Sequence, residues 1–261
     1  DVVEYGLTPA LGLSAGNPQA QGVDHQARLT GLTPGAPFYY RVAPAGGALT
    51  QRVASRAAPA ANVDQFRFVV VGDSGMNNPV QVEIADRMAA EDADLFLVTG
   101  DVVYPAGGIG AAVSEYNARF FRPYEAMLER IPAFPVVGNH DMYGLLAQPF
   151  KDTFVLPDNG QGALLNELFY SFEWGDCKFI ALETNFLHRV PIGPHVTWLN
   201  NELANNTKKW LIVYFHTPLY SAGDHGDNTW LQLSLGSVLE HGDVDLVLTG
   251  HDHNYERTLP L

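Results

Sequence analysis

Five short apolar runs in the sequence each lead into residues that bind metal ions well. In two of them a glycine precedes a carboxylate: Phe66–Gly72 leads into Asp73, and Asp94–Gly100 leads into Asp101. The other three precede an amide or imidazole side chain: Ala133–Gly138 before Asn139 and His140, Trp210–Phe215 before His216, and Val244–Gly250 before His251. This ligand set without thiolate suits zinc, manganese or iron. The pattern predicts one metal site.

The apolar runs have the composition of strands that are buried on both faces of a sheet. They are short, uninterrupted and rich in β-branched residues, as the strands of parallel sheets are. Open α/β sheets collect ligands in the loops at the carboxyl ends of their strands, so the polar side chains should meet at one edge. Stretches with a helical pattern of apolar residues lie between the runs: Pro79–Glu91, Ala111–Arg130, His195–Asn205 and Thr229–Glu240.

One segment interrupts this alternation of strands and helices. In Leu168–Glu183, two apolar stretches flank Trp174-Gly175-Asp176, which predicts a hairpin of antiparallel strands. The order β-α-β-α-β, hairpin, α-β-α-β suits two packed sheets with helices outside. The predicted fold class is α/β, a layered α-β-β-α sandwich over residues 63–261, which we expect to be incomplete at its C-terminal end.

Residues 1–58 differ from the rest of the chain. They are rich in Gly, Pro, Ala and Thr, and short alternating stretches such as His25–Leu29 and Phe38–Val42 are separated by turn signals. We interpret this region as part of a small all-β sandwich, since a complete one needs about 100 residues. Ala57–Asn62 is the predicted linker to the second domain.

Composition narrows the classes of function. The 261 residues carry a net charge of −14, which disfavours binding to nucleic acid or to an anionic membrane. The single cysteine, Cys177, excludes an intramolecular disulfide framework and a cysteine-based zinc cluster, and its apolar surroundings predict a buried, unreactive thiol. No apolar stretch approaches the roughly 20 residues of a membrane-spanning helix.

The candidate ligands are too numerous for a single tetrahedral zinc ion. Seven side chains fit two metals that share a bridging carboxylate, and such pairs lie about 3.5–4 Å apart and clamp the attacking and leaving oxygens of a phosphoryl group. The seven candidate ligands, which His140 accompanies, are Asp73, Asp101, Tyr104, Asn139, His216, His251 and His253.

Five motifs follow one another at the predicted strand ends: Gly72-Asp73-Ser74-Gly75, Gly100-Asp101-Val102-Val103-Tyr104, Gly138-Asn139-His140-Asp141, Val213-Tyr214-Phe215-His216 and Gly250-His251-Asp252-His253. In this order they resemble the calcineurin-like metallophosphoesterases. Tyr104, three residues after Asp101, and the tail Asn254-Tyr255-Glu256-Arg257 narrow the resemblance to the purple acid phosphatases. Leu29–Val42 is similar to the end of the fibronectin-type-III-like domain that precedes many of these enzymes.

The resemblance implies a role for each ligand. Asp73, Tyr104 and His253 would hold a ferric ion, and Asn139, His216 and His251 a divalent zinc, manganese or iron ion, with Asp101 as the bridge. A phenolate and carboxylates suit the harder trivalent ion, and two imidazoles suit the softer divalent one. A metal-bound hydroxide would then attack the phosphorus atom of a small phosphomonoester in line.

Three further residues are predicted to be catalytic. His140 would stabilise the charge that develops on the phosphoryl group or protonate the leaving oxygen. Asp141 could orient His140 through a hydrogen bond, and His225 occupies the stretch where the family carries histidines on the substrate side. We interpret the remaining histidines as structural or solvent-facing: His25, His188, His195 and His241.

The leading interpretation is an acid phosphatase that is secreted or periplasmic, as the resemblance implies. A phosphodiesterase or a nucleotide pyrophosphatase of the same superfamily remains open, because the metal ligands do not discriminate between these substrates. A more distant alternative is a non-catalytic protein that uses its metal site or its β-domain for binding. The oligomeric state and the physiological substrate are not predicted.

Overall fold

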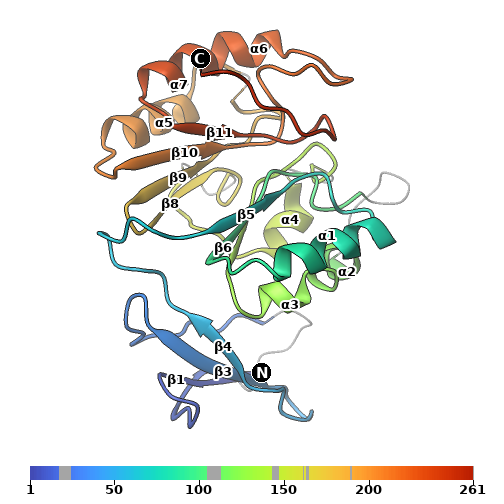
Figure 1. Ribbon diagram of the computed structural model, residues 1–261, viewed down its shortest axis with the longest axis vertical. Helices are drawn as coiled ribbons and strands as arrows, with labels where there is room; N and C mark the ends of the chain where they lie inside the picture. Colours follow the sequence, from blue (N-terminus) through green and yellow to red (C-terminus); the bar gives the residue numbers. More distant parts are fainter. Residues whose placement is uncertain are drawn as a thin grey trace.

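The first four strands form an antiparallel sheet at the N-terminal end of the molecule (blue in Figure 1). Strands β1 (Val2–Gly6), β2 (Leu13–Gly16), β3 (Pro37–Ala43) and β4 (Val53–Arg56) lie in the order β2-β1-β3-β4. The structure is a computed structural model that describes residues 1–17, 25–104, 113–142, 147–160, 162, 165–188 and 190–260.

The predicted alternating stretch His25–Leu29 is not a strand. Nearby, the hydroxyl of Tyr5 accepts a hydrogen bond from the backbone N–H of Thr30 at 3.2 Å and donates one to its carbonyl at 3.1 Å. A side chain thus supplies backbone partners that a neighbouring strand would otherwise provide. The second alternating stretch, Phe38–Val42, lies inside β3 as predicted.

The first sheet of the α/β region contains three parallel strands. They are β5 (Phe68–Val71), β6 (Leu95–Val98) and β7 (Ala133–Pro135), with β6 in the centre. Every residue of β6 is buried, because the strand has a neighbour on each side and is covered on both faces. This burial explains its uninterrupted apolar sequence.

The second sheet has the strand order β11-β10-β9-β8. Strands β8 (Tyr170–Trp174) and β9 (Cys177–Ala181) form the predicted antiparallel hairpin. Parallel pairing continues from β9 to β10 (Trp210–Tyr214) and on to β11 (Leu246–Leu248). The thiol of Cys177 is buried in this sheet, as its apolar neighbours predicted.

Aromatic side chains join the two sheets. The ring of Phe134 on β7 stacks on that of Phe172 on β8, with centroids 3.8 Å apart. Phe68 on β5 meets Phe179 on β9 edge to face at 5.7 Å. Such pairs contribute about 0.5–1.5 kcal/mol beyond the area they bury, so they fix the sheets relative to each other.

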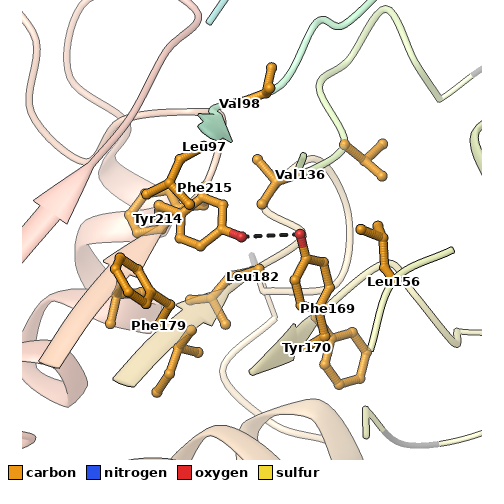
Figure 2. Packing of buried hydrophobic residues seen from close by; sticks show 14 of the residues in the cluster. Leu97, Val98, Val136, Leu156, Phe169, Tyr170, Phe179, Leu182, Tyr214 and Phe215 are labelled. Carbon is orange, nitrogen blue, oxygen red and sulfur yellow. Dashed lines mark hydrogen bonds between the residues drawn. The ribbon is translucent and has the colours of Figure 1, made fainter. Parts of the chain in front are cut away.

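A buried pair of hydroxyls links the same sheets. Tyr170 donates to the carbonyl oxygen of Pro135 at 2.7 Å, and its oxygen lies 3.0 Å from the hydroxyl of Tyr214 (Figure 2). Each hydroxyl therefore has a partner, which offsets the loss of water on burial. Pro135 and Tyr214 are the last residues of β7 and β10, so these bonds join the two strands where their following loops begin.

Helices cover the outer face of each sheet, so the elements stack as α-β-β-α (Figure 1). Helix α1 (Pro79–Ala89) begins with Asn78, whose side-chain oxygen accepts from the backbone N–H of Gln81 at 2.9 Å, and its cap and first-turn proline are typical of a helix start. Helix α5 (Pro194–Ala204) agrees with the predicted segment within a residue at each end. Of the helices the structure describes, none is long and apolar enough to span a membrane.

Two predicted helices are each divided into short pieces. The first comprises α2 (Val113–Tyr116), the π-helical turn η1 (Asn117–Phe121) and α3 (Glu125–Leu128). Pro123 lacks the N–H that a continuous helix needs. The second comprises α6 (Thr229–Leu231), the π-helical turn η3 (Gln232–Gly236) and α7 (Ser237–His241). A further short helix, α4 (Gln148–Thr153), was not predicted from the sequence.

Two side chains of the N-terminal sheet donate hydrogen bonds to the α/β region. The hydroxyl of Tyr40 on β3 donates to the carbonyl oxygen of Glu129 at 2.7 Å, and that of Ser55 on β4 donates to the carbonyl oxygen of Arg130 at 2.6 Å. Both acceptors follow α3, on the side of the sheet away from the carboxyl ends of β5 and β6. The N-terminal sheet therefore supports the fold remotely from the predicted site.

Candidate metal centre

The loops that follow five strands carry the predicted ligands to one edge of the paired sheets. Asp73 follows β5, and Asp101 and Tyr104 follow β6. The later ligands follow β7, β10 and β11: Asn139, His216, His251 and His253. Parallel strands expose their carboxyl ends at the same edge, so residues up to 178 positions apart come into contact.

One group of ligands forms around the hydroxyl of Tyr104. Its oxygen lies 3.2 Å from Oδ1 of Asp73 and 2.9 Å from Nε2 of His253. That nitrogen of His253 is 3.6 Å from the same Asp73 oxygen. Phenol, carboxylate and imidazole therefore meet at one point.

A second group forms around Nε2 of His216. This nitrogen lies 3.0 Å from Oδ1 of Asn139 and 3.2 Å from Nδ1 of His251. The three residues are those that the resemblance assigns to the divalent ion. His216 is fully buried, so solvent cannot replace these polar partners.

The tautomer of His216 follows from its other ring nitrogen. Nδ1 lies 2.8 Å from the carbonyl oxygen of Thr99, which can only accept a hydrogen bond, so Nδ1 must carry the proton. Nε2, on the other side of the ring, faces Oδ1 of Asn139 and Nδ1 of His251. A carbonyl that orients a metal-binding imidazole in this way is a common feature of metal sites.

Asp101 lies between the two groups. Its Oδ1 is 3.4 Å from Nε2 of His216 and accepts a hydrogen bond from the backbone N–H of His140 at 2.8 Å. Asp73, Asp101 and His216 each offer one ligand atom within 4.8 Å of the other two. Asp101 is therefore close to members of both groups.

Four of these residues have left-handed backbone conformations that are rare outside glycine. Their φ angles are 56° at Asp73, 49° at Asp101, 76° at His251 and 49° at His253. Asp and His adopt this region more often than most residues, yet it still costs on the order of 1–3 kcal/mol in strained cases. Such conformations gather at functional sites, where the surrounding contacts maintain them.

Two glycines permit the loops to approach each other. A Cβ atom at Gly138 would lie 2.1 Å from the backbone nitrogen of Asp101, and one at Gly100 would lie 2.5 Å from Nδ1 of His216. Gly100 also has a φ of +93°, which side chains disfavour. The glycines before the predicted ligands are thus explained by close packing of neighbouring loops.

The electrostatics of the site favour a bound cation. Burial raises the pKa of Asp73, and the charge of Asp101 adds to this effect. Burial, followed by the charges of Asp73 and Asp101, raises the pKa of Tyr104 well above its usual value. Burial and the neighbouring His216 and His225 lower the pKa of His251 to about 4, which leaves a neutral imidazole. Carboxylate oxygens, a phenol and imidazole nitrogens converge here, and this donor set fits metal ions.

His140 lies at the solvent side of the centre. Its side chain is 40% exposed, and its Nε2 is 3.9 Å from Oδ2 of Asp101. The ring packs against that of Tyr104 with a centroid distance of 4.6 Å. His140 is therefore beside the proposed ligands but open to a substrate.

The buried carboxyl group of Asp141, whose pKa burial raises to about 8, has different partners from the one the sequence suggested. Oδ2 accepts hydrogen bonds from the backbone N–H groups of Gly138 at 2.9 Å and Val102 at 3.1 Å, and Oδ1 accepts from that of Val103 at 3.2 Å. These bonds join the loop after β6 to the loop after β7. Asp141 thus holds Asp101 and Asn139 in register, instead of bonding to the ring of His140.

The ring of His225 stacks on that of His251, with centroids 4.2 Å apart and an interplanar angle of 23°. The segment that follows β10 thus brings His225 next to the proposed ligand His251. The other histidines lie elsewhere: His188 and His195 are buried together, His241 binds the carbonyl oxygen of Ser237 on its own helix, and His25 lies 3.6 Å from Asp1.

The sequence did not identify residues that orient the candidate ligands through a backbone group, or that hold the loops carrying the predicted site residues. The carbonyl of Thr99, which orients His216, left no signal because every residue carries a carbonyl. The carboxylates of Asp252 and Glu256 bind the loop that carries His225. Their position beside the Gly250–His253 motif was visible, but their partners depend on the tertiary fold.

Comparisons with known proteins agree with this geometry. A model of the calcineurin-like phosphoesterase family matches residues 66–255. Purple acid phosphatase 23 of Arabidopsis thaliana is 25% identical in an alignment of 267 positions, gaps included, that covers 90% of this chain and 58% of the relative. Acid phosphatase type 7 of Homo sapiens is 28% identical in an alignment of 260 positions, gaps included, that covers 91% of this chain and 57% of the relative.

A solved structure shows the same fold. The purple acid phosphatase PPD1 from yellow lupin (Lupinus luteus) superimposes with a TM-score of 0.77 at 20% identity and covers all of this chain and 55% of the lupin chain. The chain therefore spans a little over half the length of these relatives. The match over residues 66–255 places the chain in the calcineurin-like phosphoesterase family.

Proposed function

We propose that the protein is an acid phosphatase of the purple type, which hydrolyses small phosphomonoesters at a binuclear metal centre. The observation that carries this proposal is the separation of the ligands into two groups with Asp101 between them. The group that contains Tyr104 is suited to Fe(III), and the group that contains His216 and His251 is suited to zinc, manganese or iron(II). When bound, the two metals would supply a nucleophilic water and neutralise the phosphate oxygens.

The residues around the metals would bind and orient the substrate. His140 is exposed and neighbours Asp101, so its ring can donate a hydrogen bond to a phosphate oxygen or a proton to the leaving oxygen. His225 lies on the ring of His251, where it can contact the phosphate from the other side. Asp141 holds the loops and does not contact substrate in this mechanism.

We also propose a domain type for the N-terminal sheet and a cellular location for the protein. The N-terminal sheet would be part of a fibronectin-type-III-like domain, and the protein would act in the periplasm or outside the cell. These proposals rest on the resemblance of the sequence. Mass spectrometry of the native protein from culture supernatant and periplasmic extract would test the location, and recovery only with the cytoplasm would contradict it.

Metal analysis with a visible spectrum is the first test of the site. We expect two metals per chain, one of them iron, and a visible absorption band from the phenolate of Tyr104. Asp101→Asn should lose metal and nearly all turnover, whereas the isosteric surface variant Asp86→Asn should retain both. Two metals without iron, or full activity of Asp101→Asn, would contradict the proposed centre.

Nitrophenyl substrates test the proposed reaction. We expect the monoester to be cleaved much faster than the diester, with an optimum at mildly acidic pH. Much faster cleavage of the diester would assign the protein to the phosphodiesterases of the same superfamily. A protein that binds two metals and cleaves neither ester would instead be a binding protein.

A further inference from the structure

The loop of residues 221–226, which carries His225, is fastened to the segment of residues 250–256, which carries His251 and His253. The backbone N–H of His225 donates to Oδ1 of Asp252 at 2.8 Å. The backbone N–H of Ala222 donates to Oε2 of Glu256 at 2.9 Å. Two carboxylates from one segment thus hold two backbone groups that are three residues apart.

The fit between the two segments is close. A Cβ atom at Gly223 would lie 2.8 Å from both Cβ and Cγ of Asp252, so the glycine allows the loop backbone to rest on that side chain. Within the loop, the N–H of Gly223 bonds to Oγ of Ser221 at 3.0 Å, and that of Gly226 bonds to the carbonyl oxygen of Gly223 at 3.2 Å. Bonds within the loop and the two carboxylates outside it therefore hold its backbone together.

This attachment determines where His225 lies. The stacking of its ring on His251 places it beside the metal centre, but neither ring can fix the position of an exposed loop by itself. The ligands His251 and His253 and the two carboxylates belong to the same seven residues. Consequently, the position of His225 relative to the metals is set by a single short segment.

We propose that Glu256 is a positioning residue that, together with Asp252, holds the 221–226 loop so that His225 faces the phosphate of the substrate. This inference rests on the proposed function of the site. Glu256 is the better of the two residues to test, because it is three residues from the nearest proposed ligand and its side chain contacts the loop. In this proposal, the motif Asn254-Tyr255-Glu256-Arg257 holds the 221–226 loop through Glu256, although it contains no proposed metal ligand.

The test compares Glu256→Ala with the conservative variant Glu256→Gln and with Glu240→Ala, an exposed glutamate on α7. We expect Glu256→Ala to raise KM for the nitrophenyl monoester about fivefold to tenfold with a smaller change in kcat and unaltered metal content. Glu256→Gln keeps an acceptor oxygen and should recover most of the difference. Glu240→Ala should behave as the wild type.

Two measurements separate positioning from a general structural effect. In a His225→Ala background, Glu256→Ala should have little further effect on KM, because it acts through His225. Amide hydrogen exchange in residues 219–227 should be faster in Glu256→Ala and unchanged elsewhere. An additive effect in the double variant, unchanged exchange in the loop, or loss of metal would overturn the proposal.

Binding of inorganic phosphate to the metal-loaded protein tests the role of Glu256 separately from the proposed function of the site. We expect Glu256→Ala to weaken phosphate binding by a factor similar to the change in KM. Equal binding by the wild type and the variant would overturn only the role of Glu256. Failure of the wild type to bind phosphate would overturn the proposed function as well.

Discussion

Tyr104 and His253 are 149 residues apart in the chain, yet the phenolic oxygen of one lies 2.9 Å from Nε2 of the other. Oδ1 of Asp73 completes the group at 3.2 Å from the same phenolic oxygen. The phenol is partly buried beside two carboxylates, and burial together with these charges raises its pKa, so a strongly charged cation is needed to stabilise the phenolate. Visible absorption by an iron-bound phenolate would therefore show directly whether this site is assembled.

Tyr104→Phe should abolish the visible absorption of the iron-loaded protein, because the phenolate that gives rise to charge transfer is removed. The phenyl ring can still pack against His140, so the fold should be retained. The measurement is a visible spectrum with metal analysis, and Tyr39→Phe in the N-terminal sheet is the control that should keep its colour. A colourless and fully active wild type with two divalent ions would refute iron in this site.

His140→Ala should lower kcat by about 10²–10⁴-fold with both metals retained, which is the range for loss of a general acid or of a charge-stabilising group. The bond from His140 to Asp101 comes from the backbone N–H, so alanine preserves it. Steady-state kinetics and metal analysis would be compared with those of His241→Ala. Unchanged turnover would remove His140 from the mechanism.

Asp141→Ala should destabilise the protein by at least about 3 kcal/mol, because three buried backbone N–H groups lose their acceptor and each costs about 1–3 kcal/mol when left unsatisfied. The metals should also bind more weakly, since the loops that carry Asp101 and Asn139 would separate. Denaturant unfolding of the metal-free protein, with Asp86→Ala as control, measures the first effect. A loss of stability below about 1 kcal/mol would show that other contacts join these loops.

His188 should make the stability of the protein depend on pH. Burial lowers the pKa of His188 to about 3, and its Nε2 has no hydrogen-bond partner among the described residues. Between pH 6.5 and 3 the unfolded state therefore binds a proton that the folded state does not, so the free energy of unfolding falls as pH falls, by about 2 kcal/mol between pH 6.5 and 5 for this residue.

The variant His188→Gln isolates this contribution. Glutamine can still donate to the carbonyl of Glu183, which lies 2.8 Å from Nδ1 of His188, but it does not titrate. As pH is lowered from 7 to 5, the free energy of unfolding should therefore fall less in the variant than in the wild type. Parallel pH profiles would show that another group is responsible.

Much of the fold could be read from the order of apolar runs. All five predicted strand runs contain a strand, and the turn around Gly175 forms the hairpin as expected. Continuous helices were predicted where π-helical turns occur, at 117–121 and 232–236. Apolar periodicity does not distinguish one long helix from short segments that keep the same face buried.

The sequence by itself determined which side chains could bind metal and at which edge of the sheets they would meet. This was possible because strand ends, glycines and ligand types are local features, and parallel strands share one edge. Only the tertiary structure decided that Thr99 orients His216, that Asp141 bonds to backbone groups instead of His140, and that Glu256 reaches the loop of His225. Those contacts join segments far apart in the chain, and any backbone N–H or carbonyl can take part in them, so residue type does not reveal the partner.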